Sequence, residues 1–177
     1  ALLKDLLSKE SILKPVLVVA DRKHAEGLKL AKKLGIRTEI VNYKDGLKKE
    51  TCENLLIENL TLAKVDIVCL AGFMQILSPS FIKKFEYKIL NIHPSILPLF
   101  KGLNTHKKAL ASGMIIHGAT VHLVTEKVDS GRILGQAIIP ILENDTENSL
   151  AKRVLKMEHK LYPRVLRRFA ASKTKPL

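Results

Sequence analysis

The chain begins with short segments rich in Val, Ile and Leu that alternate with longer amphipathic segments. Strand-like segments occur at 16–20, 37–41, 65–70 and 89–92, and the first is a continuous apolar run, typical of strands covered on both faces. The segments between the first three strands carry apolar residues at helical spacing. This order of strand, helix and strand predicts an α/β fold with a mostly parallel, doubly wound sheet.

Helices are predicted wherever apolar residues recur every three or four positions. Ser78 followed by Pro79 is an N-cap signal, and Pro163 predicts a bend or interruption in the last helix. Residues 172–177 are expected to form a loose tail. The predicted helices span 1–9, 24–34, 47–62, 79–85 and 105–112, followed by a long helix capped by 144–146 that runs to about 171.

The pattern changes to strict alternation in the third quarter of the chain. The odd positions of 119–123 are apolar, whereas Thr120 and His122 are polar, which predicts a half-exposed strand. A turn at 127–131 leads to a returning strand at 133–141. This part of the chain therefore predicts a hairpin-like antiparallel unit beside the parallel strands, followed by the long carboxyl-terminal helix.

The length and composition of the chain limit the number of domains and the kinds of partner that can be expected. The chain of 177 residues, without internal repeat or linker, is expected to form one domain over 1–177. Its 30 Lys and Arg against 17 Asp and Glu give a net charge of +13, which indicates either anionic partners or simply Lys-coated helices.

Cys52 and Cys69 lack metal-site spacing and are interpreted as reduced core thiols. No apolar run or leader-like segment indicates a membrane or secretory route, so a cytoplasmic location is expected.

Polar residues suited to chemistry stand at the end of the fourth predicted strand. Asn91 and His93 project to the same side of that strand, and Pro94 prevents its ladder from continuing. Ligands of open α/β sheets bind at such strand ends, and an amide beside an imidazole suits a reaction that develops an oxyanion. If the hairpin folds over this end, Asp129 would orient the imidazole and favour its charged form.

Three further histidines and one glutamate are weaker candidates. His106, His117 and His122 lack HExxH spacing and have no carboxylate or thiol at a ligand offset, so we interpret them as structural histidines that support the site, and no metal is expected. Glu158 by its context alone is a surface residue. The chain contains no GxGxxG or Walker-type phosphate loop.

The sequence resembles the phosphoribosylglycinamide formyltransferase family along nearly its whole length. The match lies in the strings AGFMQILSP, LNIHPSILPLFKGLNTH, HGATVHLVTEKVDSG and EHKLYP, in this order. Other folate formyltransferases share NxHPS and a downstream Asp, whereas GLNTH and HGATVH resemble the glycinamide enzymes. The resemblance implies the formyltransferase fold. It also implies transfer of a formyl group from 10-formyltetrahydrofolate, as co-substrate, to the amine of phosphoribosylglycinamide in purine biosynthesis.

The resemblance also implies roles for individual residues. Asn91, His93 and Asp129 match the catalytic trio. Positions that bind the glycinamide substrate correspond to Met74, Pro94 and Glu158, the last at the ribose hydroxyls. Positions that hold the folate pterin correspond to Met74, Gln75, Ile76, Leu77, Val124, Thr125, Glu126, Lys127 and Val128. The expected partners are therefore small molecules, with no nucleic acid and no membrane, and the protein is expected to be a monomer or homodimer.

The sequence departs from the family pattern at a few places. Gln75, Asn104 and Arg132 stand where the family often has arginine, histidine and proline, and the first two are expected to alter contacts to the folate and the substrate. The family also begins with a strand and a GxGSN-like loop that holds the substrate phosphate. Their counterpart, about 15 residues at ordinary element lengths, is missing here. We therefore expect a shortened form with weak or no transfer to the glycinamide and with unpaired groups on the neighbouring strands.

Two other functions remain open at this point. In a formyltetrahydrofolate hydrolase-like reaction, water would replace the amine and formate would be released. The net charge of +13 also permits an RNA- or phosphate-binding protein on an α/β scaffold. Against the second alternative, the five Phe and three Tyr are scattered and predict no stacking platform for bases.

Overall fold

The computed structural model of the chain describes residues 1–8, 11–43 and 46–172. The predicted helix over 1–9 corresponds to α1, and Lys9 lies outside the described residues. The helices are α1 (Leu2–Leu6), α2 (Glu26–Lys33), α3 (Lys49–Leu62), α4 (Pro79–Lys84), α5 (Thr105–Ala111) and α6 (Glu147–Ser172). The strands are β1 (Val18–Ala20), β2 (Thr38–Ile40), β3 (Val68–Leu70), β4 (Ile89–His93), β5 (Ile116–Leu123) and β6 (Ile133–Pro140).

These strands form two sheets rather than the single sheet expected from the sequence. β1 pairs in parallel with β2, and the second sheet has the order β3–β4–β5–β6. Its β3–β4 pair is parallel and its other two pairs are antiparallel. The α/β class, the parallel pairing of the early strands and the β5–β6 hairpin are thus confirmed. Because β1 and β3 each leave one edge without a strand partner among the described residues, both strands are only half-buried.

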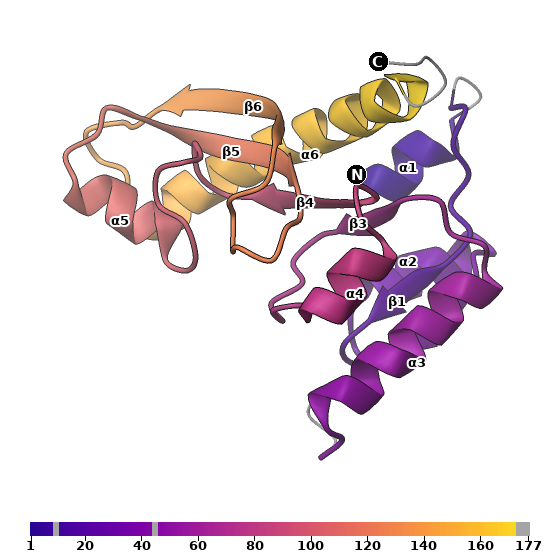
Figure 1. Cartoon of the computed structure of the whole chain (residues 1–177). Helices are drawn as coiled ribbons and strands as arrows, with labels where there is room; N and C mark the ends of the chain where they lie inside the picture. The colour runs from indigo at the N-terminus through magenta and orange to yellow at the C-terminus, as the bar shows by residue number, and fades with distance from the viewer. Residues whose placement is uncertain (9–10, 44–45, 173–177) are drawn as a thin grey trace.

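Helix α6 covers one face of the four-stranded sheet and also contacts α1 (Figure 1). It begins with a reciprocal cap, because Thr146 Oγ1 accepts the Ser149 N–H at 3.2 Å and Ser149 Oγ accepts the Thr146 N–H at 2.9 Å. The helix runs through Pro163, which is buried, so the predicted interruption is not found. Tyr162 Oη donates to the Leu90 carbonyl at 2.9 Å and thereby ties α6 to β4.

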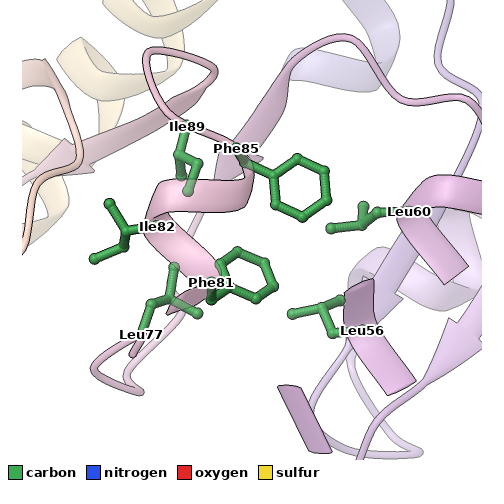
Figure 2. Packing of buried hydrophobic residues seen from close by; sticks show 7 residues of the cluster. All are labelled: Leu56, Leu60, Leu77, Phe81, Ile82, Phe85 and Ile89. Carbon is green, nitrogen blue, oxygen red and sulfur yellow. The ribbon is translucent and has the colours of Figure 1, made fainter. Parts of the chain in front are cut away.

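A second cluster of buried apolar residues lies against the opposite face of β4. Figure 2 shows Phe81 of α4 and Phe85, which directly follows α4, facing Leu56 and Leu60 of α3. The two phenyl centroids are 5.2 Å apart. Ile89 joins this cluster, whereas the next residue along β4 packs under α6. Since successive side chains of a strand point to opposite faces, the two clusters together hold β4 from both sides.

The start of α4 follows the prediction from its sequence. Ser78 Oγ accepts the Phe81 N–H at 3.2 Å, and Pro79 occupies the first helical position. The Ser78 N–H in turn donates to Glu53 Oε1 of α3 at 2.9 Å. Glu53 is buried, so this hydrogen bond joins the two helices beneath the loop that follows β3.

Strand β5 is buried on both faces, so the half-exposed strand predicted at this position is wrong. Ala119, Val121 and Leu123 pack under α6, as the alternation indicates. The polar residues Thr120 and His122 are also buried. The chain after β4 hydrogen-bonds to Thr120, whereas His122 lies beside Asn91 of β4 and Asp129 of the loop after β5. The alternation of polar and apolar residues shows that one face of a strand is polar. It does not show whether water or hydrogen-bonding protein groups lie against that face.

Helix α6 extends one residue into the segment predicted to be a loose tail. Ser172 is the last residue of α6 and its Oγ donates to the Phe169 carbonyl at 2.8 Å, so it does not belong to the predicted tail. Residues 173–177 lie outside the described residues. Among the helices described, none combines the length and apolar character needed to span a bilayer.

Candidate active site

The polar residues predicted at a strand end lie at the carboxyl end of β4, a central strand of the four-stranded sheet. Asn91 and His93 point to the same side of β4, and the antiparallel register places them opposite His122 and Thr120 of β5. The loop after β5 brings Asp129 to the imidazole of His93 at this end of β4. Asp129 Oδ2 lies 3.4 Å from His93 Nδ1. The structure therefore brings together all three residues of the expected trio.

The His93 ring is held between two acceptors. Nε2 lies 3.0 Å from the Phe100 carbonyl oxygen, which can only accept, so Nε2 carries a hydrogen. Nδ1 faces the Asp129 carboxylate. A neutral imidazole has a single N–H and could donate to only one of these oxygens, whereas the doubly protonated ring can donate to both. The buried His93 ring therefore has an acceptor at each of its two nitrogens.

Asp129 is placed by an unusual backbone conformation and by hydrogen bonds. Its φ is 47°, in the left-handed region that Asp tolerates better than most residues. Its Oδ2 accepts the Gly102 N–H at 2.9 Å, and its Oδ1 lies 3.5 Å from His122 Nε2. Burial raises the pKa of Asp129, but the His122 ring, the Gly102 amide and the His93 ring together hold that pKa below its ordinary value. The carboxylate is therefore ionised at neutral pH.

His122 lies beside two members of the trio, Asn91 and Asp129. Its Nδ1 donates to the Leu123 carbonyl at 2.8 Å, which leaves Nε2 facing the Asn91 amide nitrogen at 3.3 Å. His122 Nε2 thus lies between the Asn91 amide nitrogen and Asp129 Oδ1, and at most one of the two Asn91 N–H groups is used on His122. His122 thus fixes the orientation of the Asn91 amide.

The other two candidate histidines form a separate pair. His106 Nδ1 lies 3.2 Å from His117 Nε2, and the His117 ring also meets the Phe100 ring edge-on. Burial and then the neighbouring His106 lower the pKa of His117 to about 4, so it is neutral at physiological pH. Within the described residues, no group of three His, Cys, Asp or Glu is arranged to hold a metal ion.

The residues predicted to bind the folate lie on two loops, and their side chains differ in exposure. Met74 and Ile76, after β3, and Val128, after β5, are exposed apolar side chains. Leu77 differs, because its side chain is buried in the α3–α4 cluster and can offer a ligand only its backbone. Gln75 and Val124 are half-buried, and the exposed segment 125–127 completes the second loop. Exposed apolar residues on neighbouring loops suit a flat, partly apolar ligand.

Two predicted substrate positions, Pro94 and Glu158, belong to different elements. Pro94 is half-buried and directly follows His93, so it lies at the trio. Glu158 is half-buried on α6, and burial raises the pKa of its carboxyl. No hydrogen bond or ion pair joins Glu158 to another residue in the described part of the chain. The carboxylate is therefore free to accept hydrogen bonds from a ligand.

Several contributors to the site were not predicted individually. The Phe100 carbonyl and the Gly102 N–H hold His93 and Asp129, and both belong to the loop after β4. Prolines and a glycine in that loop predict a long connection, of the kind that often forms part of a site. They do not indicate which backbone groups face the imidazole, because side-chain identity carries little information about backbone hydrogen bonding.

Together these features define an α/β protein with an Asn, His and Asp site at the carboxyl end of a central strand. The formyl transferase family model matches residues 1–166. The chain belongs to this family, and the resemblance found in its sequence is confirmed.

Individual relatives and solved structures are similar over most of this chain. It is 39% identical to the phosphoribosylglycinamide formyltransferase of Escherichia coli (strain K12) over 158 residues, which are 89% of this chain and 74% of that protein. The crystal structure of the phosphoribosylglycinamide formyltransferase from Brucella melitensis has a TM-score of 0.91 and 48% identity, and the match covers 96% of this chain and 88% of that one.

A second kind of relative is much longer than this chain. The trifunctional purine biosynthetic protein adenosine-3 of Gallus gallus is 41% identical over 171 residues, which are 97% of this chain. The chain spans only 17% of the length of that protein. The formyl transferase fold thus also occurs as one part of a larger polypeptide.

Proposed function

We propose that this chain transfers a formyl group from 10-formyltetrahydrofolate to the amine of phosphoribosylglycinamide in purine biosynthesis. The observation that carries the proposal is the meeting of Asn91, His93 and Asp129 at the end of β4. Membership of the formyl transferase family and similarity to proteins named phosphoribosylglycinamide formyltransferase support the same reaction.

The reaction begins with attack of the glycinamide amine on the formyl carbon. The new C–N bond forms as the carbonyl electrons move onto oxygen, which gives a tetrahedral oxyanion. When this intermediate collapses, the bond to N10 of the folate breaks and one proton passes from the amine to the leaving nitrogen. The site must therefore stabilise one negative charge and help to move one proton.

Asn91 and His93 are the two donors to the oxyanion. Asn91 has one N–H group left after its contact with His122. The His93 Nε2–H faces the neutral Phe100 carbonyl at 3.0 Å. An oxyanion accepts hydrogen bonds more strongly than a neutral carbonyl. The His93 N–H can therefore turn from Phe100 to the intermediate as the negative charge develops.

Asp129 supports this chemistry from the other side of the imidazole. Its carboxylate faces His93 Nδ1 and stabilises the positive ring, which in turn strengthens the donor at Nε2. The same carboxylate also helps to relay the proton of the attacking amine, directly or through water. Because the lowered pKa of Asp129 makes it a weak base, its main contribution is electrostatic.

The two substrates approach this site from different surfaces. The exposed apolar residues Met74, Ile76 and Val128 pack against the pterin of the folate, which places N10 beside β4. Backbone groups of 74–77 and 124–128 hydrogen-bond to the polar edge of the ring. The Glu158 carboxylate accepts from the ribose hydroxyls of the glycinamide substrate, while Met74 and Pro94 contact its glycinamide end.

A formyl-transfer assay with paired amide variants tests the proposal. The chain is expected to convert the two substrates to formylglycinamide product and tetrahydrofolate, and Asn91→Ala is expected to lower kcat about 100-fold, in the range measured for single oxyanion donors. Asn59→Ala removes the same atoms from the exposed face of α3 and is the matched control. Formate release without glycinamide, at the same rate as in its presence, would instead identify a hydrolase.

A further inference from the structure

Thr120 occupies the centre of β5 and is fully buried. The strand register places it between His93 of β4 and Gln136 of β6, so the three side chains form one row across the sheet on the same face. Thr120 does not contact the His93 ring through any hydrogen bond in the described structure. Its hydroxyl instead faces the loop that follows β4.

The Thr120 hydroxyl uses all of its hydrogen-bonding capacity on this loop and on Gln136. It donates to the Ser95 carbonyl at 2.7 Å and accepts the Leu97 N–H at 3.0 Å. It also accepts from Gln136 Nε2 at 3.0 Å, and the same Nε2 donates to the Leu97 carbonyl at 2.9 Å. Both polar groups of the Leu97 backbone are therefore held by side chains of the sheet.

The same loop then supplies the two backbone groups that orient the site. Ser95, also fully buried, donates through Oγ to the Leu99 carbonyl at 2.6 Å. Directly after Leu99, the Phe100 carbonyl meets His93 Nε2 at 3.0 Å and the Gly102 N–H meets Asp129 Oδ2 at 2.9 Å. A shift of Leu97 would thus move the partners of both His93 and Asp129.

We propose that Thr120 is a positioning residue for the formyl transfer, because its hydroxyl fixes the loop that orients His93 and Asp129. The proposal rests on the function proposed above but concerns a residue that touches neither substrate. An apolar residue of the same shape would fill the same volume in β5, so packing alone does not call for a hydroxyl. The hydroxyl has its partners only on the loop and on Gln136.

A pair of variants separates the hydroxyl from the packing. Thr120→Val keeps the branched shape and removes the hydrogen bonds, whereas Thr120→Ser keeps the hydroxyl. Thr120→Val is expected to lower kcat about 10- to 100-fold with both KM values within about threefold, since small misplacements of catalytic groups act on the reacting geometry. Thr120→Ser should recover most of that loss. Val154→Ala, which removes buried methyl groups from α6, is the control for destabilisation alone and should retain kcat.

A spectroscopic measurement tests the same inference without formyl transfer. In the wild-type chain the buried, hydrogen-bonded Nε2–H of His93 should give a resolved NMR signal protected from exchange with water. Thr120→Val should lose this signal and Thr120→Ser should keep it. If Thr120→Val does not fold, Gln136→Leu at the exposed edge of the sheet removes two donors from the same network and should speed exchange of that proton.

The outcomes distinguish this inference from the proposed function. A wild-type chain that transfers no formyl group overturns the function, and the NMR comparison then decides the role of Thr120 alone. An active wild type with unchanged kcat in Thr120→Val overturns the positioning role and leaves the function standing. A protected His93 proton in Thr120→Val, or in Gln136→Leu where only that variant folds, also overturns it.

Discussion

His93 Nδ1 lies 3.4 Å from Asp129 Oδ2, although the two residues come from different segments of the chain. The contact depends on the left-handed backbone of Asp129, with φ of 47°, and on the Gly102 N–H that holds its carboxylate. Because both groups are nearly buried, their attraction is screened less than that of a surface pair. The electrostatics of the site are therefore set by the geometry of two loops.

The Asp129 carboxylate should make protein stability depend on acid pH. Its pKa is lowered in the folded chain, so the unfolded chain binds the proton more readily, and the stabilisation is complete above the unfolded value of about 3.9. It is lost as the pH falls through the folded value. The difference in free energy of unfolding between wild type and Asp129→Asn, from urea titrations, should shrink between about pH 6 and pH 2. Asp21→Asn, remote from the site, is the control, and a difference that grows on acidification would contradict the assignment.

His117 should act in the same sense as Asp129 but at higher pH, because its pKa is lowered to about 4 by burial and by His106. A histidine charges in the unfolded chain at about pH 6.5 but stays neutral in the folded chain, so stability decreases as the pH falls from 6.5 toward 4. His117→Gln should remove this dependence and flatten the slope of the unfolding free energy by up to about 1 kcal/mol per pH unit. Urea titrations of the wild type and of His117→Gln at several pH values measure the slope, and an equal slope in both would contradict the assignment.

The packing of α4 against α3 should contribute strongly to stability without affecting the chemistry. Phe81 is fully buried and its ring lies 5.2 Å from that of Phe85 (Figure 2). Phe81→Ala is expected to lower the free energy of unfolding by about 3–5 kcal/mol. Tyr87→Ala, at an exposed aromatic residue, should cost less than about 0.5 kcal/mol. Urea titration measures both, and a small effect of Phe81→Ala would mean that the cavity collapses.

Local sequence signals predicted most of the fold. Ser78 and Pro79 gave the start of α4, and the apolar periodicity gave each helix and strand to within a few residues. The errors arose where tertiary neighbours decide. Thr120 and His122 alternate with apolar residues as on a solvated strand, yet both are buried: the loop after β4 hydrogen-bonds to Thr120, and Asp129 of the loop after β5 lies beside His122. Pro163 lacks a backbone N–H, but the surrounding packing keeps α6 continuous across it.

The candidate site was predictable only in its side chains. Asn91 and His93 follow from their spacing on one strand, and Asp129 from the resemblance to the family. The contacts that orient them come from the backbone of Phe100 and Gly102 rather than from side chains. Their positions depend on a loop whose course is set by side chains of other strands, and such long-range hydrogen bonds leave no local pattern in the sequence.

Gly131 should be required for the loop that carries Asp129, because a Cβ atom at this position would lie 1.8 Å from the Leu123 carbonyl oxygen. Gly131→Ala must therefore displace the backbone, and we expect a loss of about 2–4 kcal/mol in unfolding free energy. Gly27→Ala is the matched control, since α2 leaves open space there and the substitution should stabilise by about 0.5–1 kcal/mol.

Gly131→Ala should also lower the rate of formyl transfer. Displacement of the loop at Gly131 separates Asp129 from His93, so kcat of Gly131→Ala should fall by more than about tenfold even under conditions where the variant is folded. The protected Nε2–H signal of His93 reports the fold of the other loop and should persist. Steady-state kinetics together with urea titration separate the two effects. Lost stability with unchanged kcat would show that the loop relaxes without moving Asp129.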